Sequence, residues 1–204
     1  MVSTVTDPAK VVLASASPRR AQLLDQLRIA YDVEPADVDE SVFENEPPTE
    51  YVERLARRKA THVSGLSAQS QNVNVVTHVV LAADTCIVHN GEIHGKPRSQ
   101  HEAIQLLLKL SDRTHSVYTG TAIVSGGKCI SCIVRTDVTF RSISEDEAAR
   151  YWSTQEPQGK AGGYAIQGRG AVFVRHLAGS YSNVMGLPLM ETARLLKLTG
   201  IHIF

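Results

Sequence analysis

The most apolar stretch of the chain, VVTHVVLAADTCIVH at residues 75–89, constrains the fold more than any other segment. Its length and apolar character predict a central strand of a β-sheet. Asp84 stands inside this run. A buried carboxylate without a partner costs several kcal/mol, so we expect Asp84 to meet either a metal ion or a basic group. A structural salt bridge and a functional site are both open at this point.

Strands and helices are expected to alternate along the rest of the chain. The alternation predicts an α/β fold, and 204 residues fit one domain, residues 1–204, better than two independent units. The expected elements are a strand at 11–14, a helix at 18–27, an extended piece at 31–33, a helix at 49–64, a surface loop at 65–74, a helix at 103–110 after a capping box of Ser99 and Glu102, a helix from Ser144 and Glu147 to about Trp152, a strand at 171–177 and a last helix begun by Pro188.

Charge and hydropathy limit the partners. The 21 basic and 21 acidic residues balance, so the protein as a whole does not attract nucleic acid or anionic lipid. No stretch approaches the roughly 18 apolar residues that span a bilayer, and residues 1–10 lack the apolar core of a secretory signal. We therefore expect a cytoplasmic protein with no membrane or nucleic-acid partner.

The cysteines and histidines do not predict a zinc site. Cys129 and Cys132 have CxxC spacing, but they follow a Gly-Gly turn between two β-branched runs, which predicts a hairpin. Residues three apart in a strand face opposite sides of a sheet, so these thiols should not share a metal. With Cys86 the count is odd, which suits a reducing compartment. His89 and His94 flank an Asn-Gly turn but lack a third ligand nearby.

The segment SASPRR predicts an anion site. It contains Ser15, Ser17, Arg19 and Arg20, and it stands where a buried strand gives way to a helix. Free backbone N–H groups and the positive end of the helix dipole favour phosphate at such a junction. A kinase site is the alternative, although kinase sites favour mobile tails and this segment lies between two buried elements.

Other charged residues extend this interpretation to phosphoryl chemistry. The apolar stripe of the helix at 49–64 includes the position of Lys59, which should therefore point inward. With Lys96, Glu40 and Asp84 added, the set of lysines, arginines and carboxylates is typical of Mg²⁺-assisted phosphoryl chemistry. The pattern around Lys160 lacks the features of a Walker P-loop, and no nucleophile elbow of a serine hydrolase is present.

Eight segments in a fixed order resemble one known family. The segments are LASASPRR, DVDE, LARRKA, AADTCIV, GKP, HSVYTG, KAGGYAIQG and SYSNVMGLPL, and they span about residues 11–196. Together they resemble the Maf family of nucleoside-triphosphate pyrophosphatases. The resemblance implies a fold like that of the inosine-triphosphate pyrophosphatases, with a long mixed β-sheet flanked by helices and two lobes around a central cleft. It also implies hydrolysis of a nucleoside triphosphate to the monophosphate and pyrophosphate.

The resemblance assigns roles to residues of this chain. It implies a divalent cation, Mg²⁺ or Mn²⁺, held by carboxylates, and whether Asp84 acts as a free base or as a metal ligand stays open. The implied residues are Asp84 as catalytic base, Glu40 and Asp84 as metal ligands, and Ser15, Ser17, Arg19, Arg20, Lys59, Thr85, Lys96 and Gln167 as substrate-binding residues.

The substrate expectation rests on one loop. KAGGY followed by IQG resembles the branch of the family that hydrolyses dTTP and UTP. The alternatives are the 7-methyl-GTP pyrophosphatase branch and a non-catalytic nucleotide-binding regulator of cell division. Family members are often dimers, so a homodimer is a further expectation. The polar tract at 65–74 is longer than the family usually has and suggests a loop insertion.

Overall fold

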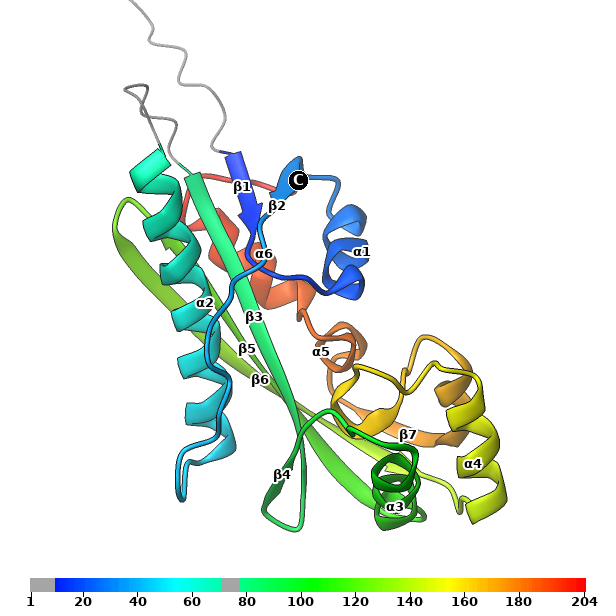
Figure 1. Cartoon of the computed structure of the whole chain (residues 1–204). Helices are drawn as coiled ribbons and strands as arrows, with labels where there is room; N and C mark the ends of the chain where they lie inside the picture. The colour runs from blue at the N-terminus through cyan, green and yellow to red at the C-terminus, as the bar shows by residue number, and fades with distance from the viewer. Residues whose placement is uncertain (1–9, 71–77) are drawn as a thin grey trace, which may run out of the picture.

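The computed structural model describes residues 10–70 and 78–204, which form an α/β fold around one mixed sheet (Figure 1). Its seven strands have the order β2-β1-β3-β5-β6-β7, with β4 paired to β3. Strand β1 is parallel to β2 and β3, whereas the other pairs are antiparallel. The strands are β1 (Lys10–Leu13), β2 (Tyr31–Val33), β3 (His78–His89), β4 (Glu92–His94), β5 (Thr114–Ser125), β6 (Lys128–Phe140) and β7 (Val174–Ala178).

Helices flank this sheet, which confirms the predicted α/β class with a mixed sheet. They are α1 (Pro18–Gln26), α2 (Pro48–Ser70), α3 (Gln100–Leu110), α4 (Glu145–Ser153), α5 (Tyr181–Met185), α6 (Leu189–Lys197) and the 3₁₀ turns η1 (Ala161–Gly163) and η2 (Arg169–Phe173). In the described part of the chain, no helix is long and apolar enough to cross a membrane. The cytoplasmic location, the single domain and the homodimer stay predictions.

The two faces of the sheet carry separate apolar cores, because neighbouring residues of a strand point to opposite sides. Val12 and Val80 pack on one face with Ala60 of α2. Leu13 faces the other side, in a larger core that includes Leu107 of α3. Figure 1 shows α2 running along the long strands β3, β5 and β6. Helix α2 therefore covers one face of the long strands.

Along one edge, strand β3 pairs first with β1 and then with β4, and a stretch of that edge between the two is unpaired. We call this unpaired stretch the gap in β3. The first residues of β3 pair with β1 as far as Leu81, whose carbonyl also accepts the amide of Ala14 at 2.8 Å. Its pairing with β4 begins at Ile87. Among the described residues, no strand pairs with residues 82–86 on that edge. Asp84 lies in this gap. On one side is the first lobe (β1, β2 and α1), and on the other is the second lobe (β4, α3, α4, β7 and the loop 154–173), as Figure 1 shows.

The helix α2 is longer than the sequence predicted. We expected it to end at residue 64 before a surface loop at 65–74, but it continues to Ser70. A single glycine, Gly65, costs a helix only about 1 kcal/mol, and no proline follows it, so the polar composition alone does not stop the helix. The remainder of the expected loop, and residues 75–77 of the expected strand, lie outside the described residues.

The segment before β7 also differs from expectation. A strand was predicted at 171–177, but residues 171–173 belong to η2 and the strand runs from Val174 to Ala178. The Glu156 carboxylate accepts the backbone amides of Arg169 and Gly170, each at 3.0 Å, and these contacts hold the chain in a turn. The short helix α5 was not predicted.

Two local predictions about caps have different outcomes. Ser144 and Glu147 form the predicted capping box at the start of α4. At α3, Ser99 accepts the amide of Glu102, but the Glu102 carboxylate accepts the amide of Arg98 instead of that of Ser99. The predicted second box is therefore only half formed.

The predicted hairpin around the CxxC pair is confirmed as β5 and β6. Cys129 packs against the core under α2, whereas Cys132 packs against the core on the opposite face. The two thiols therefore do not share a site. No group of three or more His, Cys, Asp or Glu side chains that could hold a metal ion occurs among the described residues.

Candidate active site

The SASPRR segment joins β1 to α1 at the edge of the gap in β3. Pro18 suits the first position of α1, and Ser17 precedes it with an extended backbone and no side-chain cap hydrogen bond. The Ser17 carbonyl accepts the amide of Arg20 at 3.1 Å, whereas the Ser17 side chain caps no amide of α1. The helix dipole favours an anion at this end of α1. Ser15 is 7% exposed and its Oγ accepts the Ser17 amide at 3.2 Å. Ser15 thus fixes the turn from the inside.

Arg20 is bound by protein groups on several sides. Its Nε donates to the Gly186 carbonyl at 2.8 Å, its Nη1 to Ser15 Oγ at 3.1 Å and its Nη2 to Thr85 Oγ1 at 3.3 Å. Burial lowers the pKa of Arg20, and the charge of Asp84 opposes that shift. Arg20 therefore connects the SASPRR turn to β3 and to the residues after α5.

Thr85 is also hydrogen-bonded to buried groups on β5 and α5. Thr85 Oγ1 lies 2.9 Å from Thr119 Oγ1, and Thr119 Oγ1 donates to the carbonyl of Asn183 at 3.0 Å. Thr119 and Asn183 are fully buried. The position of Thr85 is thus fixed through β5 and α5.

Lys59 lies on the inward side of α2, as the apolar stripe predicted, and is 6% exposed. Its Nζ lies 2.6 Å from Asp84 Oδ1 and 2.5 Å from Glu40 Oε1. Asp84 is 7% exposed, so a bare carboxylate would be costly at this position. Of the two partners left open by the sequence, this structure pairs Asp84 with the basic group.

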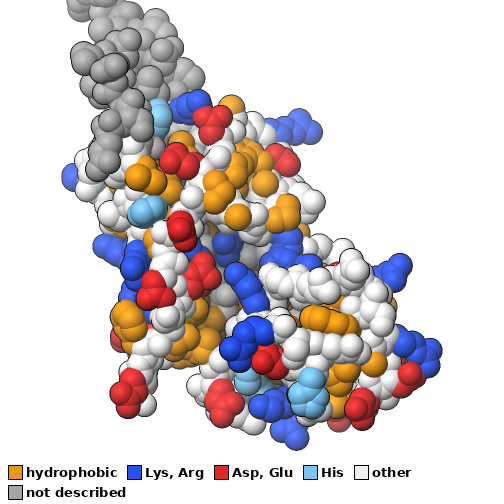
Figure 2. Space-filling model, viewed as in Figure 1, with side chains coloured by type: hydrophobic (Ala, Val, Ile, Leu, Met, Phe, Trp, Pro, Cys, Tyr) orange, Lys and Arg blue, Asp and Glu red, His pale blue; other side chains and the backbone are white. Residues whose placement is uncertain are grey.

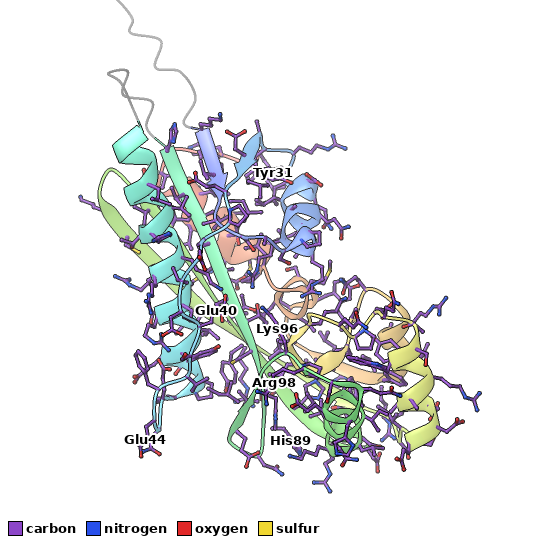
Figure 3. The ribbon with its side chains drawn as sticks, viewed as in Figure 1. Tyr31, Glu40, Glu44, His89, Lys96 and Arg98 are labelled. Atoms are coloured by element: carbon purple, nitrogen blue, oxygen red, sulfur yellow. The ribbon has the colours of Figure 1, made fainter. Side chains whose placement is uncertain are left out.

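Glu40 and Lys96 complete this charged cluster. Glu40 comes from the acidic segment before α2, and Lys96 from the loop after β4, with 3.7 Å between Glu40 Oε2 and Lys96 Nζ. Both side chains lie in the central region of the molecule (Figure 3). Burial tends to raise the pKa of Glu40, but the hydrogen bond and charge of Lys59, with the charges of Lys96 and Arg20, outweigh it, so the pKa is lowered.

The loop 154–173 forms the second-lobe wall of the site. Gly162 has a φ of +72°, and a Cβ there would lie 2.0 Å from Ile87 Cδ1, so this position requires glycine. Tyr164 is buried, and its hydroxyl lies 2.9 Å from Nε2 of His115. The loop that carries Gln167 is therefore packed against β3 and tied to β5.

All ten residues predicted for the site line one cavity of about 530 Å³. Figure 2 shows lysine and arginine side chains gathered at the depression between the two lobes. The predicted residues in the lining are Ser15, Ser17, Arg19, Arg20, Glu40, Lys59, Asp84, Thr85, Lys96 and Gln167. The cavity beside the gap in β3 thus contains residues from both ends of the chain.

The cavity also contains residues that the sequence did not assign. Lys160, Gln158 and Tyr51 are part of the lining. Lys160 follows Gly159 and is the first residue of the glycine-rich motif KAGGYAIQG, which was its signal in the sequence. Burial and the charges of Asp84 and Glu40 raise the pKa of Tyr51, so its hydroxyl stays protonated. Burial, followed by the charge of Asp84, raises the pKa of the neighbouring Cys86 thiol to about 12, which makes it a poor nucleophile.

The match to a family model decides the relationship of this chain to known proteins. The model described as Maf-like protein matches residues 10–199. The chain belongs to the Maf family. The resemblance inferred from the eight motifs is therefore confirmed, and the cavity of this Maf chain contains residues from all eight of those motifs.

Curated relatives cover nearly the full chain. One from Pseudoalteromonas translucida, named dTTP/UTP pyrophosphatase, is 47% identical over 92% of this Maf chain and 95% of its own length. Another of the same name, from Colwellia psychrerythraea, is 44% identical over 98% of this chain and 93% of its own. The Staphylococcus aureus Ham1 protein structure has a TM-score of 0.40 and 19% identity over 67% of this chain and 72% of that chain, and so low a score supports no conclusion.

Proposed function

We propose that this Maf chain is a nucleoside-triphosphate pyrophosphatase that hydrolyses dTTP and UTP to the monophosphate and pyrophosphate. The observation that carries the proposal is the cavity between the lobes, in which cations from both lobes surround two carboxylates, with Gln167 in the same lining. The two curated relatives named dTTP/UTP pyrophosphatase support the same substrates.

The carboxylates suit a divalent cation. Oxygens of Glu40 and Asp84 approach the same Lys59 Nζ at 2.5 Å and 2.6 Å, so two hard oxygen donors already converge on one positive charge. Mg²⁺ and Mn²⁺ accept such donors and usually complete their coordination with water and phosphate oxygens. When bound, the ion would neutralise phosphate charge and polarise the reacting phosphoryl group.

In the reaction, Asp84 is the group that orients and deprotonates the attacking water. Its hydrogen bond to Lys59 fixes the orientation of the carboxylate. The water oxygen bonds to phosphorus as its proton passes to Asp84, and the α,β bridging bond breaks to release pyrophosphate. Arg19, Lys59 and Lys96 neutralise the charge of the leaving group.

Recognition of the base is assigned to Gln167. Its amide offers one donor and one acceptor side by side, which can match O4 and N3–H of uracil or thymine. Gly162, Tyr164 and their neighbours hold the loop that orients this amide. Gln167 is exposed, and a bound base would cover its amide. Cytosine would then present a donor to a donor and an acceptor to an acceptor, and groups that binding buries without a partner discriminate strongly. The 5-methyl group of thymine adds only an apolar contact, so both dTTP and UTP are accepted.

A nucleotide panel with Mg²⁺ tests this function. The purified protein is incubated with dTTP, UTP, CTP, ATP, GTP and 7-methyl-GTP, and the initial products are separated by ion-exchange chromatography. We expect monophosphate and pyrophosphate, with the highest kcat/KM for dTTP and UTP.

Two outcomes would contradict different parts of the proposal. Orthophosphate and diphosphate as initial products would move the cleavage to the β,γ bond and refute the reaction. The highest kcat/KM for 7-methyl-GTP or a purine triphosphate would refute the base preference and leave the reaction intact.

A further inference from the structure

The lysine and arginine side chains that line the cavity differ in the contacts they make with other protein groups. Lys59 and Lys96 form ion pairs with carboxylates, and Arg20 donates to three neutral acceptors. Within residues 10–70 and 78–204, Arg19 and Lys160 form no ion pair. These two cations are therefore available to an anionic ligand.

Lys160 is built into the second-lobe wall. It immediately precedes η1 with an extended backbone, and its ammonium donates to the carbonyl of Glu156. An ammonium has three N–H donors, so this single hydrogen bond leaves donors for a ligand. Lys160 is half-buried and lines the cavity. A charge that is partly removed from water in this way is stabilised by an anion.

Arg19 approaches the same space from the first lobe. Burial lowers the pKa of Lys160, and the charge of Arg19 lowers it further, whereas Glu156 opposes the shift. Burial also lowers the pKa of Arg19. Both cations line the same cavity, so their like charges repel each other there. An anion between them would turn this repulsion into two attractions.

We propose that Lys160 is a phosphate-binding residue that holds the polyphosphate of the substrate from the second lobe, opposite Arg19. This inference rests on the proposed function. It also gives the loop two tasks, because Lys160 and Gln167 lie seven residues apart in the same loop and line the same cavity. Phosphate and base would then be bound by one packed segment.

The test separates charge from structure with three substitutions. Lys160→Met removes the charge and the donor, Lys160→Gln removes the charge but keeps a donor for Glu156, and Lys160→Arg keeps the charge. Lys128→Met, at the exposed start of β6, is the matched control. Binding of inorganic tripolyphosphate is measured by calorimetry, and KM and kcat are measured with dTTP.

We expect Lys160→Met and Lys160→Gln to weaken tripolyphosphate binding and raise the KM for dTTP by about 10- to 100-fold. Lys160→Arg should recover most of the loss, and Lys128→Met should behave as wild type. Equal recovery by Lys160→Gln and Lys160→Arg, or unchanged tripolyphosphate binding in Lys160→Met, would overturn the inference.

The proposed function is judged separately, on wild-type protein. If wild type fails to hydrolyse dTTP and UTP, the proposed function is wrong. Tripolyphosphate carries no base and is not a nucleotide, so its binding by the four variants still decides the role of Lys160.

Discussion

At the scale of single residues, Lys59 organises the charged centre. One buried ammonium contacts Asp84 and Glu40, which come from opposite sides of α2 in the sequence. If one carboxylate were removed, Lys59 would still be paired with the other. In an isolated buried ion pair, by contrast, the loss of one partner leaves the other charge buried and unpaired. Chemistry and stability can therefore be separated at this position.

Asp84→Asn should abolish hydrolysis and preserve the fold. The substitution is nearly isosteric but removes the group that accepts the proton, so kcat for dTTP should fall by about 10²- to 10⁴-fold. Lys59 keeps Glu40 at 2.5 Å, so the free energy of unfolding should change by less than about 2 kcal/mol. Steady-state kinetics and urea unfolding check both parts. Near-wild-type turnover would show that Asp84 is not the base.

Gln167→Glu should remove the preference for uracil and thymine. A carboxylate repels O4 and offers no donor to it, so kcat/KM for dTTP and UTP should fall by about 10- to 100-fold. The ratio of kcat/KM for UTP to that for CTP is the measurement. An unchanged ratio would exclude Gln167 from reading the base, and Gln158→Glu in the same lining is a matched control.

At the scale of elements, the site depends on how strands and loops are joined. His115 on β5 is 2% exposed and lies between the rings of Phe140 and Tyr164, with centroid distances of 4.8 Å and 5.5 Å. Its Nε2 contacts the Tyr164 hydroxyl of the loop. A neutral imidazole thus links the second-lobe wall to the sheet.

This buried histidine makes stability depend on pH. Burial, followed by the charge of His89, lowers the pKa of His115 to about 3, with Asp137 opposing and His94 adding to the shift. The unfolded chain binds a proton near pH 6.5 that the folded protein does not, so stability is full above that pH and is lost as the pH falls.

We expect His115 to account for up to ~1.4 kcal/mol of lost stability per pH unit between about pH 6.5 and pH 5. Urea unfolding at several pH values measures this slope. In His115→Gln, which keeps a hydrogen-bonding group for Tyr164, the slope should be shallower. An equal slope in both proteins would contradict the assignment to His115.

Two glycine substitutions test the packing of α2 with opposite expected signs. A Cβ at Gly120 of β5 would lie 2.3 Å from the Val52 carbonyl oxygen, a backbone atom that cannot move away alone. Gly120→Ala should therefore lower the free energy of unfolding by at least about 1–3 kcal/mol.

Gly65 lies at an exposed helical position, where an added Cβ would meet nothing within 4 Å. Gly65→Ala should therefore raise the free energy of unfolding by about 0.5–1 kcal/mol. Thermal unfolding measures both, and destabilisation by Gly65→Ala would contradict the helical extension of α2.

At the scale of the whole molecule, one sheet passes through both lobes. Strand β3 pairs with β1 of the first lobe and with β4 of the second, and β5 pairs with β3 along most of its length. The two lobes therefore share their central strands, and neither contains a complete sheet of its own.

The shared sheet predicts a single cooperative unfolding transition. If the lobes unfold together, the calorimetric and van't Hoff enthalpies of unfolding should agree. Gly120→Ala should then lower the midpoint temperature of one transition and should not produce a second transition. Differential scanning calorimetry measures both enthalpies. Two resolved transitions would contradict the single-domain prediction.

The sequence by itself determined the local features of this protein. A continuous apolar run identified the strand around Asp84, and apolar periodicity identified the inward face of Lys59. The strand-to-helix junction predicted the anion site at SASPRR. These signals are local, because backbone geometry sets which side of an element a residue occupies. The order of the eight motifs identified the family.

Only the tertiary structure decided which of these residues meet. It placed Asp84 on Lys59, 25 residues away, and the Arg20 guanidinium on the Gly186 carbonyl, 166 residues away. It also brought Lys160 into the cavity. Such partners depend on strand order and on the gap along β3, which no local pattern encodes, because periodicity specifies a buried face without specifying what covers it.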